Sequence, residues 1–171
     1  MGIAINYVII EMYENHPNWQ RVLAVAASLG EVEVKRLTMQ EEHFLFSHVL
    51  AGLVDSQPVG YSRFVVQRIG EDDERLLVKF NDQVLEEAKV ITFAVVPEFQ
   101  NRGIGRALQQ AGLARARELG CYQFNSRSNF HSEANHHLKI SMGFGIQPSL
   151  QDDSLYFIWP LQAKERDTFD M

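Results

Sequence analysis

The sequence is poor in cysteine, in long apolar runs and in basic clusters. A single cysteine, Cys121, stands among 171 residues, so no intrachain disulfide can form, which fits a reducing cytoplasm. No run of about eighteen or more apolar residues predicts a membrane helix. The net charge is −6 and no basic block occurs, which disfavours a nucleic-acid partner. The first residues carry Glu11 and Glu14 and no basic segment, so we expect no signal peptide.

The composition is that of an ordinary globular protein. Hydrophobic residues make up 46% of the chain and charged residues 22%. This length suffices for one domain with a real core, and we expect residues 1–171 to form a single domain. Cys121 follows a Leu-Gly pair and opens an apolar segment, so we expect a small core residue and no catalytic nucleophile.

One stretch, Val90–Gly112, organises the chain. It reads VITFAVVPEFQNRGIGRALQQAG. Val90–Val96 is almost entirely apolar, which predicts a buried strand, and Pro97 cannot continue a central strand. From Ile104 onward the apolar residues recur at helical spacing. We therefore predict a strand, a short turn and a helix that begins among glycines.

The glycines of this turn are suited to a phosphate ligand. Gly103 and Gly105 have no Cβ, so their backbone N–H groups can approach a ligand closely. A helix N-terminus adds unpaired donors and a favourable dipole. No Gly-Lys-Ser/Thr follows, so the stretch is not a P-loop, and Leu108 stands where the Rossmann fingerprint needs its third glycine.

The whole string VVPEFQNRGIGRAL resembles the acyl-CoA signature of the GNAT superfamily of N-acetyltransferases, whose core is Gln/Arg-x-x-Gly-x-Gly/Ala after a strand. A second segment, Ser132–Phe144, is similar to another block of that superfamily, Asn-Glu-Ala-Ala-x-x-Leu-Tyr-x-x-x-Gly-Phe. The resemblance covers about residues 49–161. It implies an α/β (α+β) fold: a mixed, mostly antiparallel sheet of about seven strands, splayed at the acyl-CoA site and flanked by about four helices.

The same resemblance implies which residues bind acetyl-CoA. Backbone groups of Val95 and Val96 would bind the pantetheine arm, and a backbone N–H near Val95 could polarise the thioester oxygen. The turn and the helix start would line the pyrophosphate through backbone N–H groups and guanidinium charge. The full set of expected binding residues is Val95, Val96, Gln100, Asn101, Arg102, Gly103, Ile104, Gly105, Arg106, Ser132 and His137.

Two positions of the second block differ from the family pattern. Ser132 replaces an asparagine that often touches pantetheine, and its hydroxyl can still donate or accept. Lys139 replaces the tyrosine that often protonates the departing thiolate. A lysine buried beside an apolar arm has a lowered pKa and can serve as that acid. It could equally pair with a CoA phosphate or lie in solvent, and Ser141 is a lesser substitute.

The candidate base is Glu87, at the start of the signature strand, where many relatives supply a carboxylate. It would act directly or through water. The alternative is a solvated surface charge. On an extended segment the neighbouring Glu86 points the other way.

Other polar residues leave alternatives open. His131, His136 and His137 cluster near the second helix, where two adjacent positions differ by about 100°, so at most one faces a cleft. Without a convincing set of companions they predict no metal site. Asn125, Arg127 and Asn129 share one strand face, which could border the acceptor, or Arg127 could form a salt bridge.

The leading hypothesis is an N-acetyltransferase that joins acetyl-CoA and a primary amine in a ternary complex, with no metal, no membrane and a possible homodimer. The alternative is a non-catalytic CoA-binding module of the same fold. An ATP-using phosphotransferase is disfavoured, because the sequence does not offer the lysine and the metal-binding carboxylates that such an enzyme needs.

The rest of the chain predicts a series of short elements. These are a strand at Ile3–Met12, a helix from Asn18 to Gly30, a short edge strand at Glu31–Leu37, a helix opened by the capping box Thr38–Glu41, a hairpin at Val49–Ile69, a strand or helical piece at Leu76–Leu85, a strand after Cys121, a helix at Ser132–Gly143, strands at Phe144–Ile146 and Leu155–Leu161, and a polar tail.

Overall fold

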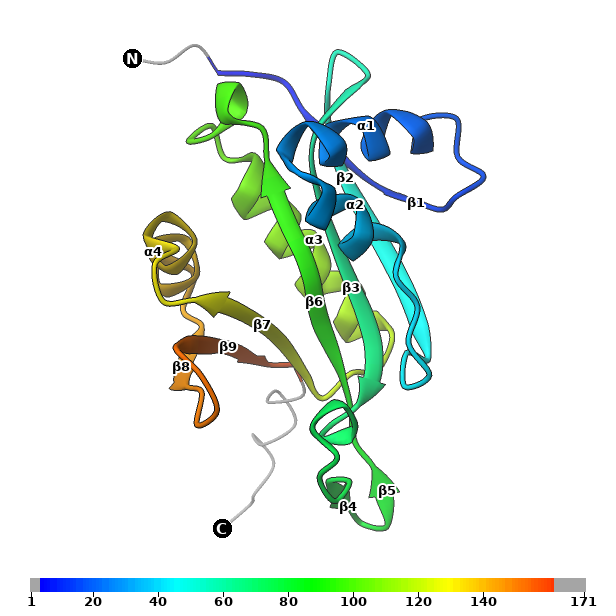
Figure 1. Cartoon of the computed structure of the whole chain (residues 1–171), viewed down its shortest axis with the longest axis vertical. Coiled ribbons are helices and arrows are strands. Elements are labelled where there is room, and N and C mark those ends of the chain that lie inside the picture. The colour runs from blue at the N-terminus through cyan, green and yellow to red at the C-terminus, as the bar shows by residue number, and fades with distance from the viewer. Residues whose placement is uncertain (1–3, 162–171) are drawn as a thin grey trace, which may run out of the picture. The chain divides into compact units, whose positions relative to one another are not determined.

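The computed structural model describes residues 4–161, with the backbone alone at Asp73 (Figure 1). The chain folds into two compact units. Unit 1 joins the chain up to Val65 with Val90–Gly112, and unit 2 joins Val66–Lys89 with the chain from Leu113 onward. Among the described residues no helix is long and apolar enough to cross a membrane.

The described residues form strands β1 to β9, α-helices α1 to α4 and short 3-10 turns η1 and η2. Their bounds are β1 Val8–Met12, α1 Trp19–Leu29, α2 Glu31–Thr38, β2 Phe46–Val54, β3 Gln57–Arg68, η1 Glu71–Asp73, β4 Lys79–Phe80, β5 Gln83–Val84, β6 Glu86–Val95, η2 Pro97–Phe99, α3 Ile104–Glu118, β7 Gln123–Asn129, α4 Glu133–Met142, β8 Gly145–Pro148 and β9 Ser154–Pro160.

Within residues 4–161 the strands form a seven-stranded sheet in the order β1-β2-β3-β6-β7-β9-β8 and a two-stranded sheet of β4 and β5. β1 and β2 are antiparallel, with Val8 opposite Leu53. β7 and β9, and β8 and β9, are antiparallel too, with Gln123 opposite Pro160. The predicted mixed, mostly antiparallel sheet of seven strands with four helices is confirmed. Its splay stays a prediction.

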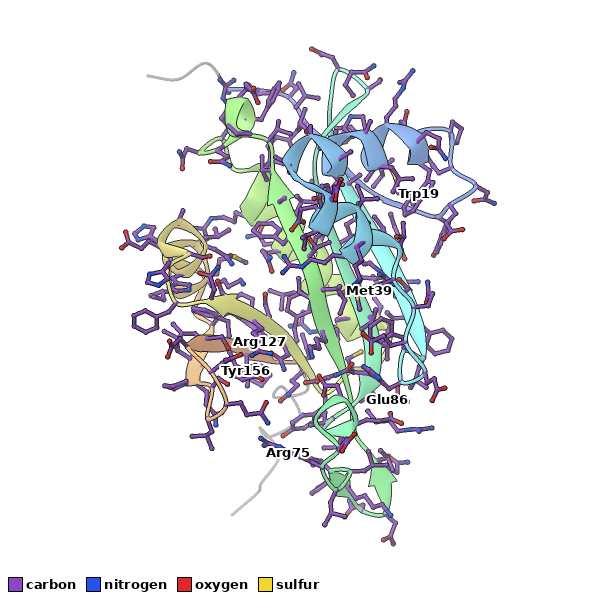
Figure 2. All side chains as sticks on the ribbon, viewed as in Figure 1. Trp19, Met39, Arg75, Glu86, Arg127 and Tyr156 are labelled. Carbon is purple, nitrogen blue, oxygen red and sulfur yellow. The ribbon has the colours of Figure 1, made fainter. Side chains whose placement is uncertain are left out.

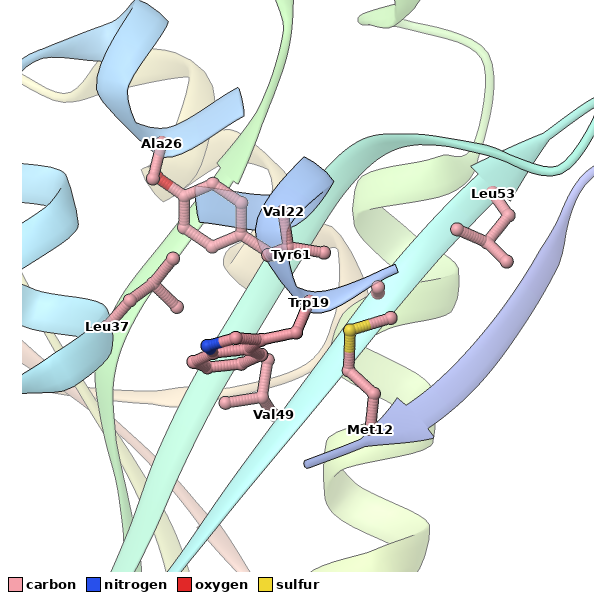
Figure 3. Close-up of a cluster of buried hydrophobic side chains, with 9 residues drawn as sticks. Met12, Trp19, Val22, Ala26, Leu37, Val49, Leu53 and Tyr61 are labelled. Carbon is pink, nitrogen blue, oxygen red and sulfur yellow. The ribbon is translucent and has the colours of Figure 1, made fainter. Parts of the chain in front are cut away.

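Unit 1 has its own hydrophobic core (Figure 3). The indole of Trp19 lies in it beside Val49, and Val22 and Ala26 follow on the same face of α1 at helical spacing. The helix predicted between Asn18 and Gly30 is therefore confirmed as α1, Trp19–Leu29, and the Asn18 side chain makes no capping hydrogen bond.

Two predictions for the next segment are wrong. Glu31–Leu37, predicted as an edge strand, lies in helix α2. The alternation of charged and apolar residues hid a helical pattern in which Val34 and Leu37, three residues apart, both face the core. Acidic residues in the first turn and basic residues in the last turn also suit the helix dipole.

The capping box at Thr38–Glu41 opens no helix. The Thr38 hydroxyl donates to the carbonyl of Val34 at 3.0 Å and so belongs to the last turn of α2. The end of α2 is instead fixed by Arg63 of β3, a buried arginine. Its guanidinium donates to the carbonyls of Arg36 and Met39 at 2.8 and 2.7 Å. A side chain distant in sequence thus decides where this helix ends.

The remaining elements of the sequence are mostly where they were predicted. β2 and β3 form the hairpin at Val49–Ile69, and α4 ends at Met142 with Gly143, whose φ is 95°, as its C-cap. The strand predicted at Ile3–Met12 is shorter, because β1 begins at Val8, and Ile3 lies outside the described residues. The polar tail from residue 163 also lies outside them.

Unit 2 contains the segment that the sequence left ambiguous, Leu76–Leu85. It forms the small hairpin of β4 and β5, with Asn81 and Asp82 at positive φ in the tight turn. Cys121 is fully buried, and burial, with the charges of Glu86 and Glu87, raises the pKa of its thiol to about 11. The interpretation of Cys121 as a core residue is confirmed.

Candidate functional site

The segment between β6 and α3 lies in unit 1 and turns sharply. η2 begins at Pro97, and the chain then takes positive φ angles at Asn101 (59°) and at Gly103 (88°) before α3 begins at Ile104. Gln100 bridges back across this loop, since its side-chain nitrogen donates to the carbonyl of Val95 at 2.9 Å. The predicted strand, turn and glycine-flanked helix start are confirmed.

The start of α3 rests on β2. Ile104 is 1% exposed, and a Cβ built at Gly52 of β2 would come within 2.9 Å of its Cγ2 atom. Because the Ile104 side chain is buried, only its backbone can reach a ligand. A Cβ built at Gly103 would meet only the Tyr7 hydroxyl, at 3.5 Å, and Gly103 itself is exposed.

Cationic side chains flank this helix start. Arg102 is exposed, and its guanidinium carbon lies 5.5 Å from the centroid of the Phe99 ring. Arg106 is exposed on the first turn of α3. The first N–H groups of a helix have no acceptor inside the helix, and with nearby guanidinium charge they suit a phosphate or pyrophosphate group.

Backbone groups at the end of β6 are already partly engaged. The N–H of Val96 donates to the carbonyl of Val59 at 2.9 Å, and its carbonyl accepts from the N–H of Phe99 at 3.0 Å. If Val96 binds a pantetheine arm as predicted, it can do so only through the second lone pair of its carbonyl oxygen. The prediction for the N–H of Val95 is unaffected by these bonds.

In unit 2, α4 presents its polar residues in different directions. Ser132 donates from its hydroxyl to the Asn129 side chain at 3.1 Å. His136 contacts the carbonyl of Asn129 at 2.8 Å, whereas His137 is exposed. The Ser141 hydroxyl donates to the carbonyl of Leu138 at 2.7 Å. The binding roles of Ser132 and His137 therefore stay predictions.

Lys139 is the buried lysine of the described chain, 1% exposed on α4. Its Nζ atom donates to the Ser126 hydroxyl at 2.6 Å and lies 5.1 Å from the centroid of the Phe157 ring. Burial lowers its pKa to about 7. The alternative of a solvated lysine is therefore wrong.

Glu87 is 3% exposed, so the alternative of a solvated surface charge is wrong too. Its carboxylate accepts from the side-chain nitrogens of Gln67 at 3.0 Å, Gln123 at 2.7 Å and Asn125 at 3.4 Å. We call these residues of unit 2 the Glu87 cluster. Among the described residues, the side-chain donors to this buried carboxylate are these three amides.

Sequence reasoning missed Gln67, Gln123 and Ser126. The first two lie on strands on either side of β6 in the sheet order, and only the strand pairing brings them to Glu87. The sequence did contain a signal for Ser126, because side chains alternate along β7 and place Ser126 on the other face of the strand from Asn125 and Arg127. A polar residue on that face needs a polar partner once it is buried.

Arg127 forms a salt bridge, as one alternative predicted. Its guanidinium pairs with Asp152 and lies over the Tyr156 ring, 5.5 Å from the centroid (Figure 2). Among residues 4–161, no group of His, Cys, Asp or Glu side chains is arranged to hold a metal ion.

The fold and the site agree with one protein family. A model of the acetyltransferase (GNAT) family matches residues 11–144, and the chain belongs to that family. No curated protein matches the sequence.

Solved structures with the same fold include acetyltransferases of several organisms. The GNAT domain of S. lividans PAT has a TM-score of 0.67 and 19% identity, over 90% of this chain and 89% of that one. Arabidopsis thaliana NAA60 in complex with acetyl-CoA has a TM-score of 0.65 and 14% identity, over 90% and 99%. Escherichia coli YhbS in complex with CoA has a TM-score of 0.65 and 16% identity, over 94% and 84%. At these identities the likeness shows the fold.

Proposed function

We propose that this protein is an acyl-CoA-dependent N-acetyltransferase, which transfers the acetyl group of acetyl-CoA to a primary amine by direct attack in a ternary complex. The observation that carries the proposal is the open, glycine-containing loop at the start of α3, in a chain of the GNAT family. Most of the rate gain in such a reaction comes from holding two reactants in line.

The loop would bind the pyrophosphate of acetyl-CoA. Gly103 and Gly105 would offer backbone N–H groups, and Arg102 and Arg106 would add positive charge from exposed positions. The observed geometry fits this role, because Gly103 has the positive φ of 88° that lets the chain turn without a side chain toward the ligand.

Lys139 would be the acid that gives a proton to the leaving thiolate. It occupies the position at which relatives of this family often have a tyrosine. With a pKa of about 7, caused by burial, its ammonium form releases a proton far more readily than an exposed lysine would. The Ser126 hydroxyl, which accepts the hydrogen bond of Lys139, would hold the Nζ atom of this lysine in place.

Glu87 would be the base. The amine that attacks must first lose a proton, and a carboxylate can take it directly or through a water molecule. The Gln67 and Gln123 side chains fix both carboxylate oxygens, so the position of the base does not depend on solvent. The substrate ammonium gives its first proton to Glu87, and the nitrogen attacks the acyl carbon. The C–S bond then breaks as the thiolate takes the proton of Lys139, and the second proton that the nitrogen loses in becoming an amide restores the ammonium form of Lys139 through solvent.

Calorimetric titration of the purified protein with acetyl-CoA and with CoA tests the first half of the proposal. Release of free thiol in the presence of a panel of primary amines tests the second half. We expect binding of both ligands and thiol release with at least one amine. Binding without release on any amine would favour a CoA-binding module without catalysis, and absence of binding would reject both functions.

A further inference from the structure

β6 carries one residue more than β3 between two hydrogen bonds that join these neighbouring strands. The N–H of Ile69 donates to the carbonyl of Leu85 at 3.0 Å, and the N–H of Val96 donates to the carbonyl of Val59 at 2.9 Å. The chain takes ten steps from Val59 to Ile69 and eleven steps from Leu85 to Val96. In a regular antiparallel ladder the two numbers are equal, so β6 contains a bulge.

The bulge lies opposite Gly60, a buried residue of β3 in unit 1. A Cβ built at Gly60 would come within 2.9 Å of the Ala94 carbonyl oxygen and within 3.3 Å of the Val95 Cα atom. One residue of β3 therefore faces two residues of β6, which is the pattern of a bulge. Real Cβ atoms essentially never come as close as 2.9 Å to another atom, so only glycine fits at this position without a shift of its neighbours.

The close contact at Gly60 is with the main chain, and this distinguishes Gly60 from Gly52, another buried strand glycine. At Gly52 the nearest atom is Cγ2 of Ile104, so a Cβ there would press on α3 through a side chain. At Gly60 the nearest atom is a carbonyl oxygen of β6, so a Cβ there would press on the strand backbone directly. The two glycines therefore support different parts of unit 1, the start of α3 and the end of β6.

The end of β6 is the part of the strand that would hold the thioester of acetyl-CoA. Val95 is half-buried, and its carbonyl accepts a hydrogen bond from the Gln100 side chain at 2.9 Å, so the loop after β6 also fixes this residue. A backbone N–H stabilises a developing oxyanion only when its position is fixed before the reaction begins. The fit of β6 against Gly60 determines that position for Val95.

We propose that Gly60 is a positioning residue of the acyl site: by facing two residues of β6, it places the N–H of Val95 for the carbonyl oxygen of the thioester. This inference rests on the proposed function and adds to it a residue of β3 that acts through the backbone of Val95. A side chain at position 60 would displace this N–H and weaken the stabilisation of the transition state. It would leave the phosphate loop at the start of α3 in place, so CoA would still bind.

The test uses acetyl-CoA that is labelled with ¹³C at the carbonyl carbon and observed by NMR in complex with the protein. Polarisation of the carbonyl group moves this signal downfield from its position in free acetyl-CoA. We expect a downfield shift with the unmodified protein and a smaller one with Gly60→Ala. Both kcat and kcat/KM should fall on the order of tenfold to a hundredfold, as for a contact made in the transition state. An unchanged carbonyl signal and an unchanged kcat in Gly60→Ala would overturn the proposal.

Gly52→Ala is the matched control, because it adds the same methyl group at a buried strand glycine but presses on α3. It should weaken CoA binding and leave the carbonyl signal of the saturated complex in place, whereas Gly60→Ala should do the reverse. Equal effects of both variants on CoA affinity and on the carbonyl signal would mean a general loosening of the sheet and would overturn the proposal.

A second variant keeps the test valid if Gly60→Ala does not fold. It combines Gly60→Ala with Ala94→Gly, because a glycine at position 94 lets the backbone of β6 yield to the new methyl group at a lower cost in stability. The combined variant should fold and should still show the smaller carbonyl shift. A full carbonyl shift in this protein would contradict the role of Gly60.

Backbone amide signals of the ¹⁵N-labelled protein without ligand separate this inference from the proposed function. Gly60→Ala should move the signals of Val95 and Val96, and Gly52→Ala should move those of Ile104 and Gly105. If the signals respond in this way but acetyl-CoA does not bind to the unmodified protein, Gly60 still positions Val95 and the transferase is rejected. If acetyl-CoA binds and thiol is released while Gly60→Ala changes neither the carbonyl signal nor kcat, the transferase stands and the role of Gly60 is rejected.

Discussion

The Nζ atom of Lys139 lies 2.6 Å from the Ser126 hydroxyl, and both side chains are buried in unit 2. Ser126 is an uncharged partner, and no carboxylate among the described residues forms an ion pair with this lysine. Burial therefore acts without opposition and lowers the pKa of Lys139 to about 7 from its ordinary value of 10.5. The lowered pKa affects both the stability of the fold and the proposed chemistry.

The first prediction concerns stability. Below pH 7 Lys139 carries a proton in the folded and in the unfolded state, so the penalty of a buried charge is fully present. Between pH 7 and 10.5 only the unfolded state keeps that proton, so the penalty is relieved as pH rises. The free energy of unfolding, relative to Lys139→Met, should rise by up to about 1.4 kcal/mol per pH unit in this range.

Urea unfolding of both proteins at several pH values measures this difference. Lys35→Met, which removes an exposed lysine of α2, is the matched control, and its difference from the unmodified protein should stay flat. A flat difference for Lys139→Met as well would mean that the lysine keeps its proton in the folded state across the range.

The second prediction concerns the acid. For the free enzyme, kcat/KM for acetyl-CoA should fall as pH rises through about 7, because Lys139 then loses the proton that it must donate. Lys139→Met should lose turnover with little change in CoA affinity. Lys139→Tyr, which introduces the residue common in the family, should move this fall upward toward about pH 10, the ordinary pKa of tyrosine.

Steady-state rates over a series of pH values, together with calorimetric CoA titrations, check this prediction. Ser126→Ala is a useful companion variant, because it removes the hydrogen-bond partner of the Lys139 Nζ atom and keeps the lysine itself. If Lys139→Met loses CoA affinity and turnover by the same factor, the lysine contacts a CoA phosphate and is not the acid.

The local part of the site could be predicted from the sequence. The turn after β6 depends on Gly103 and on a helix that begins at Ile104, and both features are encoded within a few consecutive residues. α4 and its end at Gly143 are likewise local. Short-range geometry of this kind follows from backbone preferences and apolar spacing.

The non-local part could not be predicted. Whether Glu87 is solvated or buried depends on amides from Gln67 and Gln123, which lie 20 and 36 residues away along the chain. The error at α2 has the same origin. Its helical state depends on packing of Leu37 into the core of unit 1 and on Arg63, 27 residues after the carbonyl of Arg36 that it binds. Tertiary contacts here outweigh the local alternation.

The third prediction concerns the phosphate loop. Gly103→Glu should abolish CoA binding, because it places a side chain and a negative charge at the expected position of the pyrophosphate. Gly103→Gln imposes the same strain at a φ of 88° without the charge, so it should retain more affinity. The difference in CoA affinity between the two variants should shrink at high salt, since salt screens the repulsion between the introduced carboxylate and the pyrophosphate. Unchanged CoA affinity of Gly103→Glu in calorimetry would end the argument for this loop.

The last prediction concerns the support of the loop by β2. A Cβ at Gly52 would come within 2.9 Å of Ile104 Cγ2, a distance that real Cβ contacts essentially never show. Gly52→Ala must therefore push against the Ile104 side chain, and we expect the first turn of α3 to shift with it. Its N–H groups would then move, and CoA affinity should fall by roughly tenfold. Leucine has no atom equivalent to Cγ2, so adding Ile104→Leu should restore most of the affinity. The four proteins of this double-mutant cycle, compared by CoA titration, should show strong coupling. Additive losses would mean that Gly52 does not act on CoA binding through Ile104.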